Sequence, residues 1–495
     1  MFIATIAGTF FEKESALKRS ASYFSTLFFT TMLRRWNQTP HFFSNAIRAL
    51  AFCCLLGSSI IARTEDAQAQ SSLPSAKSST APTEFRSLER ALLTPEKVIR
   101  LNLSGLMLTE LPASIGKLKN LQHLDLSFNN LDSLPPEMCS LTNLESITVL
   151  FNQIKKLPDS LNNLKKLRSL NIASNKLVEF PMVVTQLKTL QVLDIAGNSF
   201  ATIPAELFSL TELQDLSLSS NKFTQLSADI KNLQNLLTLD LSSNQLYTLP
   251  AEIGSLPKLQ QLELGSNQLQ TLPDEICKLS KLQTLVVRNN KLTALPALIG
   301  NLSKLRTLSA GKNRIKSLPD SLQGLLLLRD LDVSKNRLSE LPTSIGELSS
   351  LENFDASSNF LKLLPQKFAQ LIALKNLTLV SNEFETFPQS ITKLGALEML
   401  DFGNNFISKI PNEISENANL QVLILRGNRL LALPTDIGFC QNLVAINVAY
   451  NELITLPAEI AKLSKLQQLS IGKNPMQTLE IERIRGLVPQ ARIGF

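Results

Sequence analysis

A period of 23 residues runs through the chain from Val98 without insertion or deletion. Each unit follows the pattern LxxLxLxxNxLxxLPxxIxxLxx. Counted from its first residue, position 9 is an asparagine in sixteen units. Self-similarity at such a period is the signature of a repeat architecture, in which each unit packs mainly against its neighbours. The asparagines are Asn129, Asn152, Asn175, Asn198, Asn221, Asn244, Asn267, Asn290, Asn313, Asn336, Asn359, Asn382, Asn405, Asn428, Asn451 and Asn474.

The apolar pattern of each unit predicts its local structure. The leucines of LxxLxL alternate with other residues, so they point to one side of a short strand. One unit has too little interior to bury seven apolar side chains, but stacked units enclose one continuous core. The proline after the fifth leucine fixes φ and opens a return segment too short for a full helix. We therefore predict an α/β solenoid, a right-handed horseshoe with about 17 parallel concave strands and short 3-10, helical or extended convex segments.

The repeated asparagine is expected to be structural. After the strand the backbone turns without regular secondary structure, which leaves N–H and C=O groups inside the stack. A side-chain amide is both donor and acceptor, so it can bond such groups in its own and the next coil. Departures from the pattern are Leu106 at the asparagine position of the first unit, and Asn417 and Cys440 at one core leucine position of two consecutive units.

The two ends of the chain differ from the array. Basic residues precede an apolar run at 50–62, and Ala67-Gln68-Ala69 follows it, which is typical of a secretory signal peptide cleaved after Ala69. The run is too short to span a bilayer. The alternatives are an unstructured leader that is not a signal, or a wrongly assigned start with Met32 as the true initiator. We divide the chain into a leader (1–69), a disordered linker (70–82), a cap helix (83–97), the array (98–479) and a C-terminal cap (480–495).

Composition gives little support to catalytic or nucleic-acid-binding functions. The net charge of +7, which falls to +4 without residues 1–69, is too small to indicate nucleic-acid binding. The two histidines, His41 and His123, make a multi-histidine metal site improbable. The chain has no Gly-rich phosphate loop and no GxSxG, CxxC or HExxH motif. Beyond the leader only Cys139, Cys277 and Cys440 remain, too scattered for a disulfide framework. We expect neither enzymatic activity nor a cofactor.

The candidate binding surface is the concave sheet, where positions 3, 5, 7 and 8 of each unit face outward. Rigid parallel strands make this surface preorganised for a protein partner. Exposed aromatic residues and arginines are typical of binding hot spots, although variation on a sheet surface, or cover from a terminal segment, is the ordinary alternative. Three groups stand out: His123, Phe128, Leu150 and Phe151 near the start, Val286 and Arg288 beside Lys312 in the middle, and Met399, Ile424, Arg426 and Tyr450 near the end.

Two columns of charge accompany these groups. Position 5 carries acidic residues in many units. The simplest explanation is that an acid at this position belongs to the consensus of the repeat, and the alternative is a cation site. Lysines gather at the end of each unit, and such a rim suits an acidic glycan or an anionic surface, although solvation is the usual explanation. The acids are Asp125, Asp194, Asp240, Glu263, Asp332, Asp355 and Asp401, and the lysines are Lys119, Lys165, Lys166, Lys188, Lys258, Lys281, Lys304 and Lys465.

The repeat resembles the leucine-rich-repeat (LRR) family throughout residues 98–479. The end sequences LERALLTPEKVIRLNLSG and IRGLVPQARIGF look like the caps of exported 23-residue LRR proteins of spirochaete-type bacteria. That resemblance implies a secreted or cell-envelope binding protein in contact with host molecules. The LPxxI repeats of intracellular scaffold and Ras-pathway LRR proteins are similar too, and the consensus does not separate the groups. We expect a monomeric, exported, bacterial protein-binding protein without a membrane span, with a cytoplasmic scaffold or regulatory subunit as the alternative.

Overall fold

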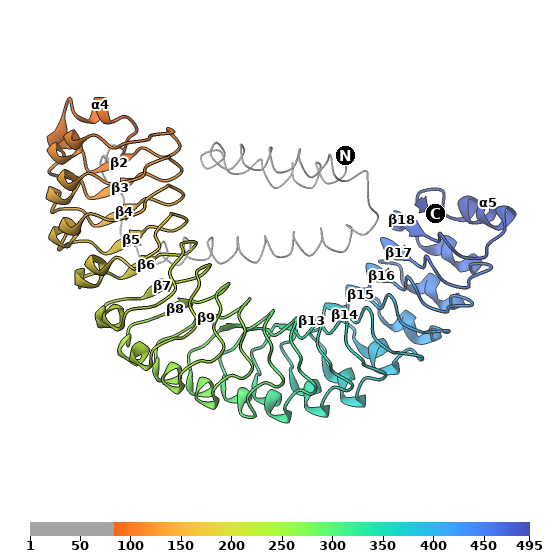
Figure 1. The fold of residues 1–495 in the computed structure, drawn as a ribbon. Helices are drawn as coiled ribbons and strands as arrows, with labels where there is room; N and C mark the ends of the chain where they lie inside the picture. Colours follow the sequence, from red (N-terminus) through yellow and green to blue (C-terminus); the bar gives the residue numbers. More distant parts are fainter. Residues whose placement is uncertain (1–83) are drawn as a thin grey trace, which may run out of the picture. The chain divides into compact units, whose positions relative to one another are not determined.

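The computed structural model describes residues 84–495. The expected leader (1–69) and linker (70–82) lie outside the described residues. Within 84–495, Figure 1 shows coils that follow one another along an open arc, each with a short strand on the inner side and a short helical turn on the outer side. No helix in this part of the chain is both long and apolar enough to cross a membrane.

The nineteen strands of the described residues form one parallel sheet. From β2 to β18 each strand pairs with the next at an offset of 23 residues, so Leu239 lies between Leu216 and Leu262. Seventeen strands belong to the repeat, as the period predicts, and one is added at each end. They are β1 (Glu84–Phe85), β2 (Arg100–Asn102), β3 (His123–Asp125), β4 (Ser146–Thr148), β5 (Ser169–Asn171), β6 (Val192–Asp194), β7 (Asp215–Ser217), β8 (Thr238–Asp240), β9 (Gln261–Glu263), β10 (Thr284–Val286), β11 (Thr307–Ser309), β12 (Asp330–Asp332), β13 (Asn353–Asp355), β14 (Asn376–Thr378), β15 (Met399–Asp401), β16 (Val422–Ile424), β17 (Ala445–Asn447), β18 (Gln468–Ser470) and β19 (Arg492–Gly494).

A short 3-10 turn forms the outer side of each complete coil, in most cases directly after the proline. Pro250 has extended backbone (φ −71°, ψ 149°), and the turn begins at the next residue. Five residues suit a 3-10 turn better than an α-helix, whose hydrogen bonds need a longer segment. The turns of the coils are η4 (Ala113–Lys117), η5 (Pro136–Ser140), η6 (Asp159–Asn163), η7 (Met182–Gln186), η8 (Ala205–Ser209), η9 (Ala228–Asn232), η10 (Ala251–Ser255), η11 (Asp274–Lys278), η12 (Ile299–Asn301), η13 (Asp320–Gly324), η14 (Thr343–Glu347), η15 (Gln366–Gln370), η16 (Gln389–Lys393), η17 (Asn412–Glu416), η18 (Thr435–Phe439) and η19 (Ala458–Lys462), and a further turn, η3 (Pro95–Lys97), precedes the array.

The leucine columns fill a single core. Leu239, Leu241 and Leu246 of one coil are fully buried, and the buried cluster continues from Leu88 to Val488. Equivalent residues of successive coils lie at the spacing of neighbouring strands, so each apolar side chain packs against its counterparts in the coils before and after it. The prediction of a solenoid with a parallel sheet and short outer turns is confirmed.

The sixteen asparagines at position 9 form a ladder of hydrogen bonds that joins the bend after each strand to a neighbouring coil. The Nδ2 of Asn244 donates to the carbonyl oxygen of Leu241 in its own coil (3.1 Å) and to that of Leu218 in the preceding coil (3.0 Å). Its Oδ1 accepts the backbone N–H of Phe223, also in the preceding coil, at 3.1 Å. All sixteen asparagines make these three kinds of bond.

The direction of the ladder corrects one expectation. We predicted bonds to the next coil, whereas each amide reaches the preceding one. The reason lies in the backbone, because the side of the bend that faces the next coil is already bonded there. The N–H of Ser243, for example, donates to the carbonyl oxygen of Gly265 at 2.8 Å.

The two ends of the array are covered differently. In place of one cap helix over 83–97, the chain forms β1, the one-turn helix α4 (Leu88–Ala91) and η3. Pro95 accounts for this division, because a proline disfavours helical backbone in the residue before it. At the other end α5 (Thr478–Leu487) is followed by β19, which pairs with β18. The carboxylate of Glu480 accepts the backbone N–H of Leu456 (3.1 Å), so α5 is fastened to the last coils.

Candidate functional site

Position 8 of every coil has the same unusual backbone conformation. Its φ lies in the left-handed region in all seventeen coils, between +51° and +70°. Glycine and asparagine adopt this region readily, and Gly105 and Asn289 follow that rule. Phe128, Phe151 and Tyr450 also occupy position 8, although a bulky side chain in this region is an outlier. The fold therefore presents these three aromatic rings at the rim of the sheet against their own backbone preference.

Phe128 and Phe151 come from neighbouring coils and form a stacked pair. Their ring centroids are 5.2 Å apart and their planes are inclined by 17°. About half of each side chain is exposed, 48 % for Phe128 and 53 % for Phe151. The carbonyl oxygen of the half-buried Leu150 accepts the N–H of Phe128 at 2.8 Å. Phe128 and Phe151 therefore form an exposed apolar pair of the kind that suits contact with a partner, and Leu150 is bonded to Phe128 through its backbone.

His123, the fourth residue of that group, lies on β3 itself. In the register of the sheet it is opposite Arg100 and Ser146. Burial lowers the pKa of His123, and the nearby Arg100 lowers it further, while Glu145 acts in the opposite direction. Burial and Arg100 thus both favour the neutral imidazole.

The middle group consists of Val286, Arg288 and Lys312, and the structure brings only the first two of them close together. Val286 and Arg288 flank Gly265, where an added Cβ would lie 3.4 Å from Cγ of Arg288 and 3.6 Å from Cγ1 of Val286. Lys312 is one coil further along, at position 8, and is exposed. The sheet beside Val286 carries Glu263, and burial, reinforced by the nearby Asp240, raises the pKa of Glu263 to about 7. An acid that holds its proton near neutral pH makes this region different from both aromatic groups.

The group near the end of the array combines aliphatic and charged residues. Met399 and Ile424 lie on β15 and β16, and Val422, which the sequence analysis did not select, is opposite Met399 in the register. The guanidinium carbon of Arg426 lies 4.5 Å from the centroid of the Tyr450 ring, and 49 % of Tyr450 is exposed. This distance is characteristic of a cation–π contact. The structure therefore brings Arg426 and Tyr450 together at the rim and places the aliphatic residues on the sheet beside them.

Comparison with known proteins identifies this architecture. A family model described as leucine-rich repeat region matches residues 98–175 and 252–325, and another described as leucine rich repeat matches 188–246, 372–430 and 418–476. An LRR protein of Leptospira interrogans is 36% identical, with a TM-score of 0.72 over 83% of this chain and 100% of its own. The chain belongs to the leucine-rich-repeat family.

Other LRR structures are similar at lower identity. The plant peptide hormone receptor RGFR1, solved in complex with RGF2, is 27% identical with a TM-score of 0.60, over 79% of this chain and 77% of its own. YopM from Yersinia enterocolitica is 28% identical with a TM-score of 0.57, over 77% and 75%. The sequence matches none of the curated proteins. LRR arrays are in general scaffolds for binding proteins, and this coarse function applies to the chain.

The acid column of the LRR sheet has a local structural role. The Oδ1 of Asp125 accepts the N–H of Ser127 at 2.8 Å, two residues further along, which starts the bend after the strand. Glu263 makes no equivalent bond among the described residues. The described residues also contain no group of three or more His, Cys, Asp or Glu residues that could hold a metal ion. The same bond to position 7 is made by Asp194, Asp240, Asp332, Asp355 and Asp401.

The lysine rim is also bonded within the array. Lys166 donates to the side-chain oxygen of Asn143 (2.8 Å), and Lys465 donates to that of Asn442 (2.7 Å), each one coil earlier. Those asparagines, at position 23, form a second ladder that the sequence analysis missed: Nδ2 of Asn143 donates to the carbonyl oxygen of Lys119 at 3.0 Å. The recurrence of asparagine at position 23 of several units was the sequence signal for this second ladder. Part of the basic rim therefore holds neighbouring coils together.

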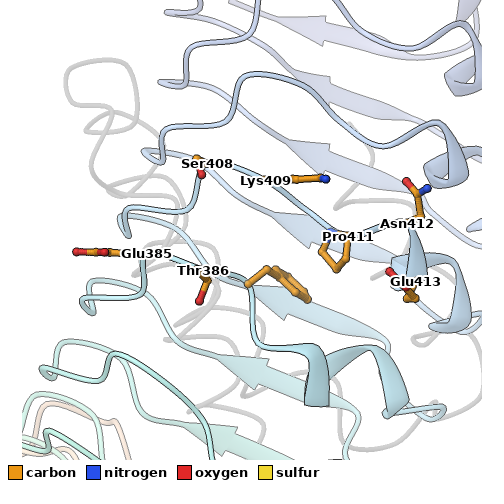
Figure 2. Close-up of a pocket in the computed structure, with 8 residues that line it drawn as sticks. Glu385, Thr386, Ser408, Lys409, Pro411, Asn412 and Glu413 are labelled. Atoms are coloured by element: carbon orange, nitrogen blue, oxygen red, sulfur yellow. The ribbon is translucent and has the colours of Figure 1, made fainter.

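The three cysteines of the described residues lie in the core. Cys139, Cys277 and Cys440 are free and buried, and burial raises the pKa of Cys440 to about 11. A hollow of about 470 Å³ lies between residues 385–387 and 408–413 (Figure 2). It is lined by Phe387, Lys409 and other residues after position 11 of their coils, so it does not belong to the concave surface.

Proposed function

We propose that this LRR protein is a non-enzymatic binding protein, exported by a bacterium, that receives a protein partner on its concave sheet. The observation that carries the proposal is the Phe128–Phe151 stack. Both rings are about half exposed, and both occupy a left-handed backbone position where most other coils have serine, lysine, glycine or asparagine. Because serine and lysine adopt the same conformation in other coils, the fold does not require an aromatic ring at this position, and an exposed pair of rings is typical of a binding surface.

The surroundings of the stack support a protein partner. A rigid apolar patch with aromatic rings binds by excluding water, and its preorganised geometry reduces the entropy lost on association. Similarity to RGFR1, a plant peptide hormone receptor solved in complex with RGF2, supports a polypeptide ligand. Similarity to the Leptospira protein supports a bacterial setting. The middle and C-terminal groups are proposed as further parts of the same concave surface.

The proposal is tested with matched baits. Wild type, Phe128→Ser/Phe151→Ser and the control Leu363→Ser/Leu431→Ser are immobilised, and the proteins they capture from envelope and host-cell extracts are quantified by mass spectrometry. Leu363 and Leu431 are also exposed apolar residues (62 % and 59 %) but follow position 11 of their coils. We expect at least one protein to be retained by wild type and control and reduced about tenfold or more by the phenylalanine variant.

Two outcomes contradict the proposal. If the three baits capture the same proteins in the same amounts, the aromatic stack is not a binding surface. If the protein isolated from its producing cells begins at Met1 or Met32, the export part fails, because export predicts a mature chain beginning at Gln70.

A further inference from the structure

The coil formed by residues 420–442 carries two arginines that lie over aromatic rings of different neighbours. The guanidinium carbon of Arg426 is 4.5 Å from the ring centroid of Tyr450 in the following coil. That of Arg429 is 4.7 Å from the ring centroid of Phe406 in the preceding coil. Both rings are exposed, 49 % for Tyr450 and 40 % for Phe406. A guanidinium over a ring face retains the N–H donors in its own plane, so the ring supports the cation without using its hydrogen bonds.

The backbone that carries these arginines is fixed. The carbonyl oxygen of Arg426 accepts the N–H of Asn404 (2.7 Å), and the N–H of Arg429 donates to the carbonyl oxygen of Ile407 (2.9 Å). Between them Asn428 is buried and its Nδ2 donates to the carbonyl oxygen of Phe402 at 3.0 Å. The backbone beneath the two arginines is therefore ordered before a ligand binds, so only their side chains remain to be ordered on binding.

Their charges are not neutralised within the described part of the chain. None of its carboxylates lies within ion-pair distance of Arg426 or Arg429, and none of its groups accepts a hydrogen bond from either side chain. Arg483 is a contrast, because it pairs with Glu480 at 2.7 Å. Arginines supported by rings and lacking an internal acid are suited to an external anion.

The sheet beside the arginines carries aliphatic side chains. Val422 and Ile424 belong to the strand of the same coil, and Met399 is opposite Val422 in the preceding strand. All three are half-buried. A ligand that covers this surface therefore meets aliphatic groups on the strand and two cations at its rim. That combination is complementary to a peptide with apolar and acidic residues, whereas a sulfated glycan offers no apolar side chain to the strand.

We propose that Arg426 and Arg429, held by Tyr450 and Phe406, form a binding surface for an acidic peptide segment of a protein partner, with each guanidinium donating to carboxylate oxygens. The inference rests on the proposed protein-binding function and adds the chemistry of the segment recognised. It does not depend on the phenylalanine stack at the other end of the sheet.

The test uses short fluorescein-labelled poly-L-glutamate and the full chain, with binding followed by fluorescence anisotropy at low salt, where charge contacts are strongest. We expect Arg426→Gln/Arg429→Gln to weaken binding about tenfold. The control Arg314→Gln/Arg337→Gln removes the same charge from position 10, which Arg429 also occupies, at exposed arginines with no ring contact among the described residues. It should weaken binding less than about twofold.

A third variant tests the role of the rings. Phe406→Gln/Tyr450→Ser gives these positions the residue types that other coils carry and keeps both arginines. We expect affinity for poly-L-glutamate to fall about threefold, because the guanidinium groups lose their support. Circular dichroism melting curves verify that all variants remain folded.

Several results would overturn the inference. Absence of poly-L-glutamate binding by wild type would refute it. Equal losses of affinity in the two double arginine variants would also refute it, because binding would then depend on the overall positive charge and not on Arg426 and Arg429. Heparin that binds more tightly than poly-L-glutamate, and only when Arg426 and Arg429 are present, would assign the surface to a sulfated glycan. Phe128→Ser/Phe151→Ser should leave poly-L-glutamate affinity unchanged, so failure of either proposal is recognised separately.

Discussion

The coils at the start and in the middle of the sheet share one backbone and differ in the residue at position 8. Phe128 and Phe151 have φ angles of 56° and 52°, and Ser243 and Ser266 have 55° and 58°. The bends are also bonded alike, since the N–H of Phe128 donates to Leu150 and that of Ser243 to Gly265, both at 2.8 Å. The fold therefore sets the conformation at position 8 but does not require the aromatic ring.

Positions 8 and 9 of the coil therefore have different roles. Position 9 is an asparagine with a full set of bonds in sixteen coils, whereas position 8 ranges from glycine to phenylalanine and lysine without a change of conformation. Stability is expected to depend on position 9, and recognition on position 8. Two predictions test this division and another tests the acid column in the middle of the sheet, and they follow from the largest expected effect to the smallest.

Asn244→Ala should lower the free energy of unfolding by about 3 kcal/mol, because it leaves the carbonyl oxygens of Leu218 and Leu241 and the N–H of Phe223 without partners. The matched change Ser243→Ala, one residue earlier, should cost less than about 0.5 kcal/mol. Urea unfolding gives both values, and amide hydrogen exchange locates the opening near Phe223. Equal effects of the two changes would contradict the division of roles.

Glu263→Gln should stabilise the middle of the sheet at high pH only. The pKa of Glu263 is about 7 in the folded protein against 4.5 as the ordinary value. Below pH 4.5 the carboxyl group is protonated in both states. As pH rises toward 7 the unfolded chain ionises first, so the native carboxyl increasingly disfavours folding. We expect a gain of about 3 kcal/mol at pH 8 and almost none at pH 4.5, measured by thermal unfolding.

A second variant identifies the cause of that pH dependence. Asp240→Asn removes the neighbouring charge and keeps an oxygen for the N–H of Ser242. It should give part of the same gain at pH 8, because Asp240 contributes to the raised pKa of Glu263. The same gain from Glu263→Gln at both pH values would mean that ionisation of Glu263 is not what destabilises the sheet.

Exchanging residues at position 8 should have the smallest effect on stability. Phe128→Ser/Phe151→Ser and the reciprocal Ser243→Phe/Ser266→Phe should each change the free energy of unfolding by less than about 1 kcal/mol, because the backbone is already left-handed in both regions. Only the first exchange should reduce partner capture. Loss of structure in the first coils of that variant, detected by hydrogen exchange, would show that the rings belong to the core of the fold.

The parts predicted from sequence are those that every coil repeats. The strands, the buried leucine columns and the structural role of Asn244 follow from a pattern that recurs at a fixed spacing. The direction of the ladder did not follow, because two equivalent neighbours flank each coil and only the backbone bonds distinguish them. The left-handed backbone at position 8 was also missed, although Gly105, Gly197 and Asn404 at that position were a signal for it.

The candidate site was less predictable because it depends on contacts between coils. The pattern marked Phe128 and Phe151 as exposed, and the structure stacks them. Arg429 and Phe406 were overlooked, since position 10 was not counted among the outward positions, and their contact appears only when adjacent coils are placed in register. The acid column was assigned to the consensus without its mechanism, which is the bond from Asp125 to the following turn.

Because each asparagine bonds to the preceding coil, the coils of the array are completed in the order in which they are synthesised. The bend of one coil is complete only when the amide of the following coil accepts its N–H, as Asn474 does for Leu453 at 3.0 Å. During synthesis the newest coil on the ribosome is therefore always unfinished, and each addition locks the one before it. A chain cut short anywhere within the array would end in such an open coil, and a protease would be expected to begin there.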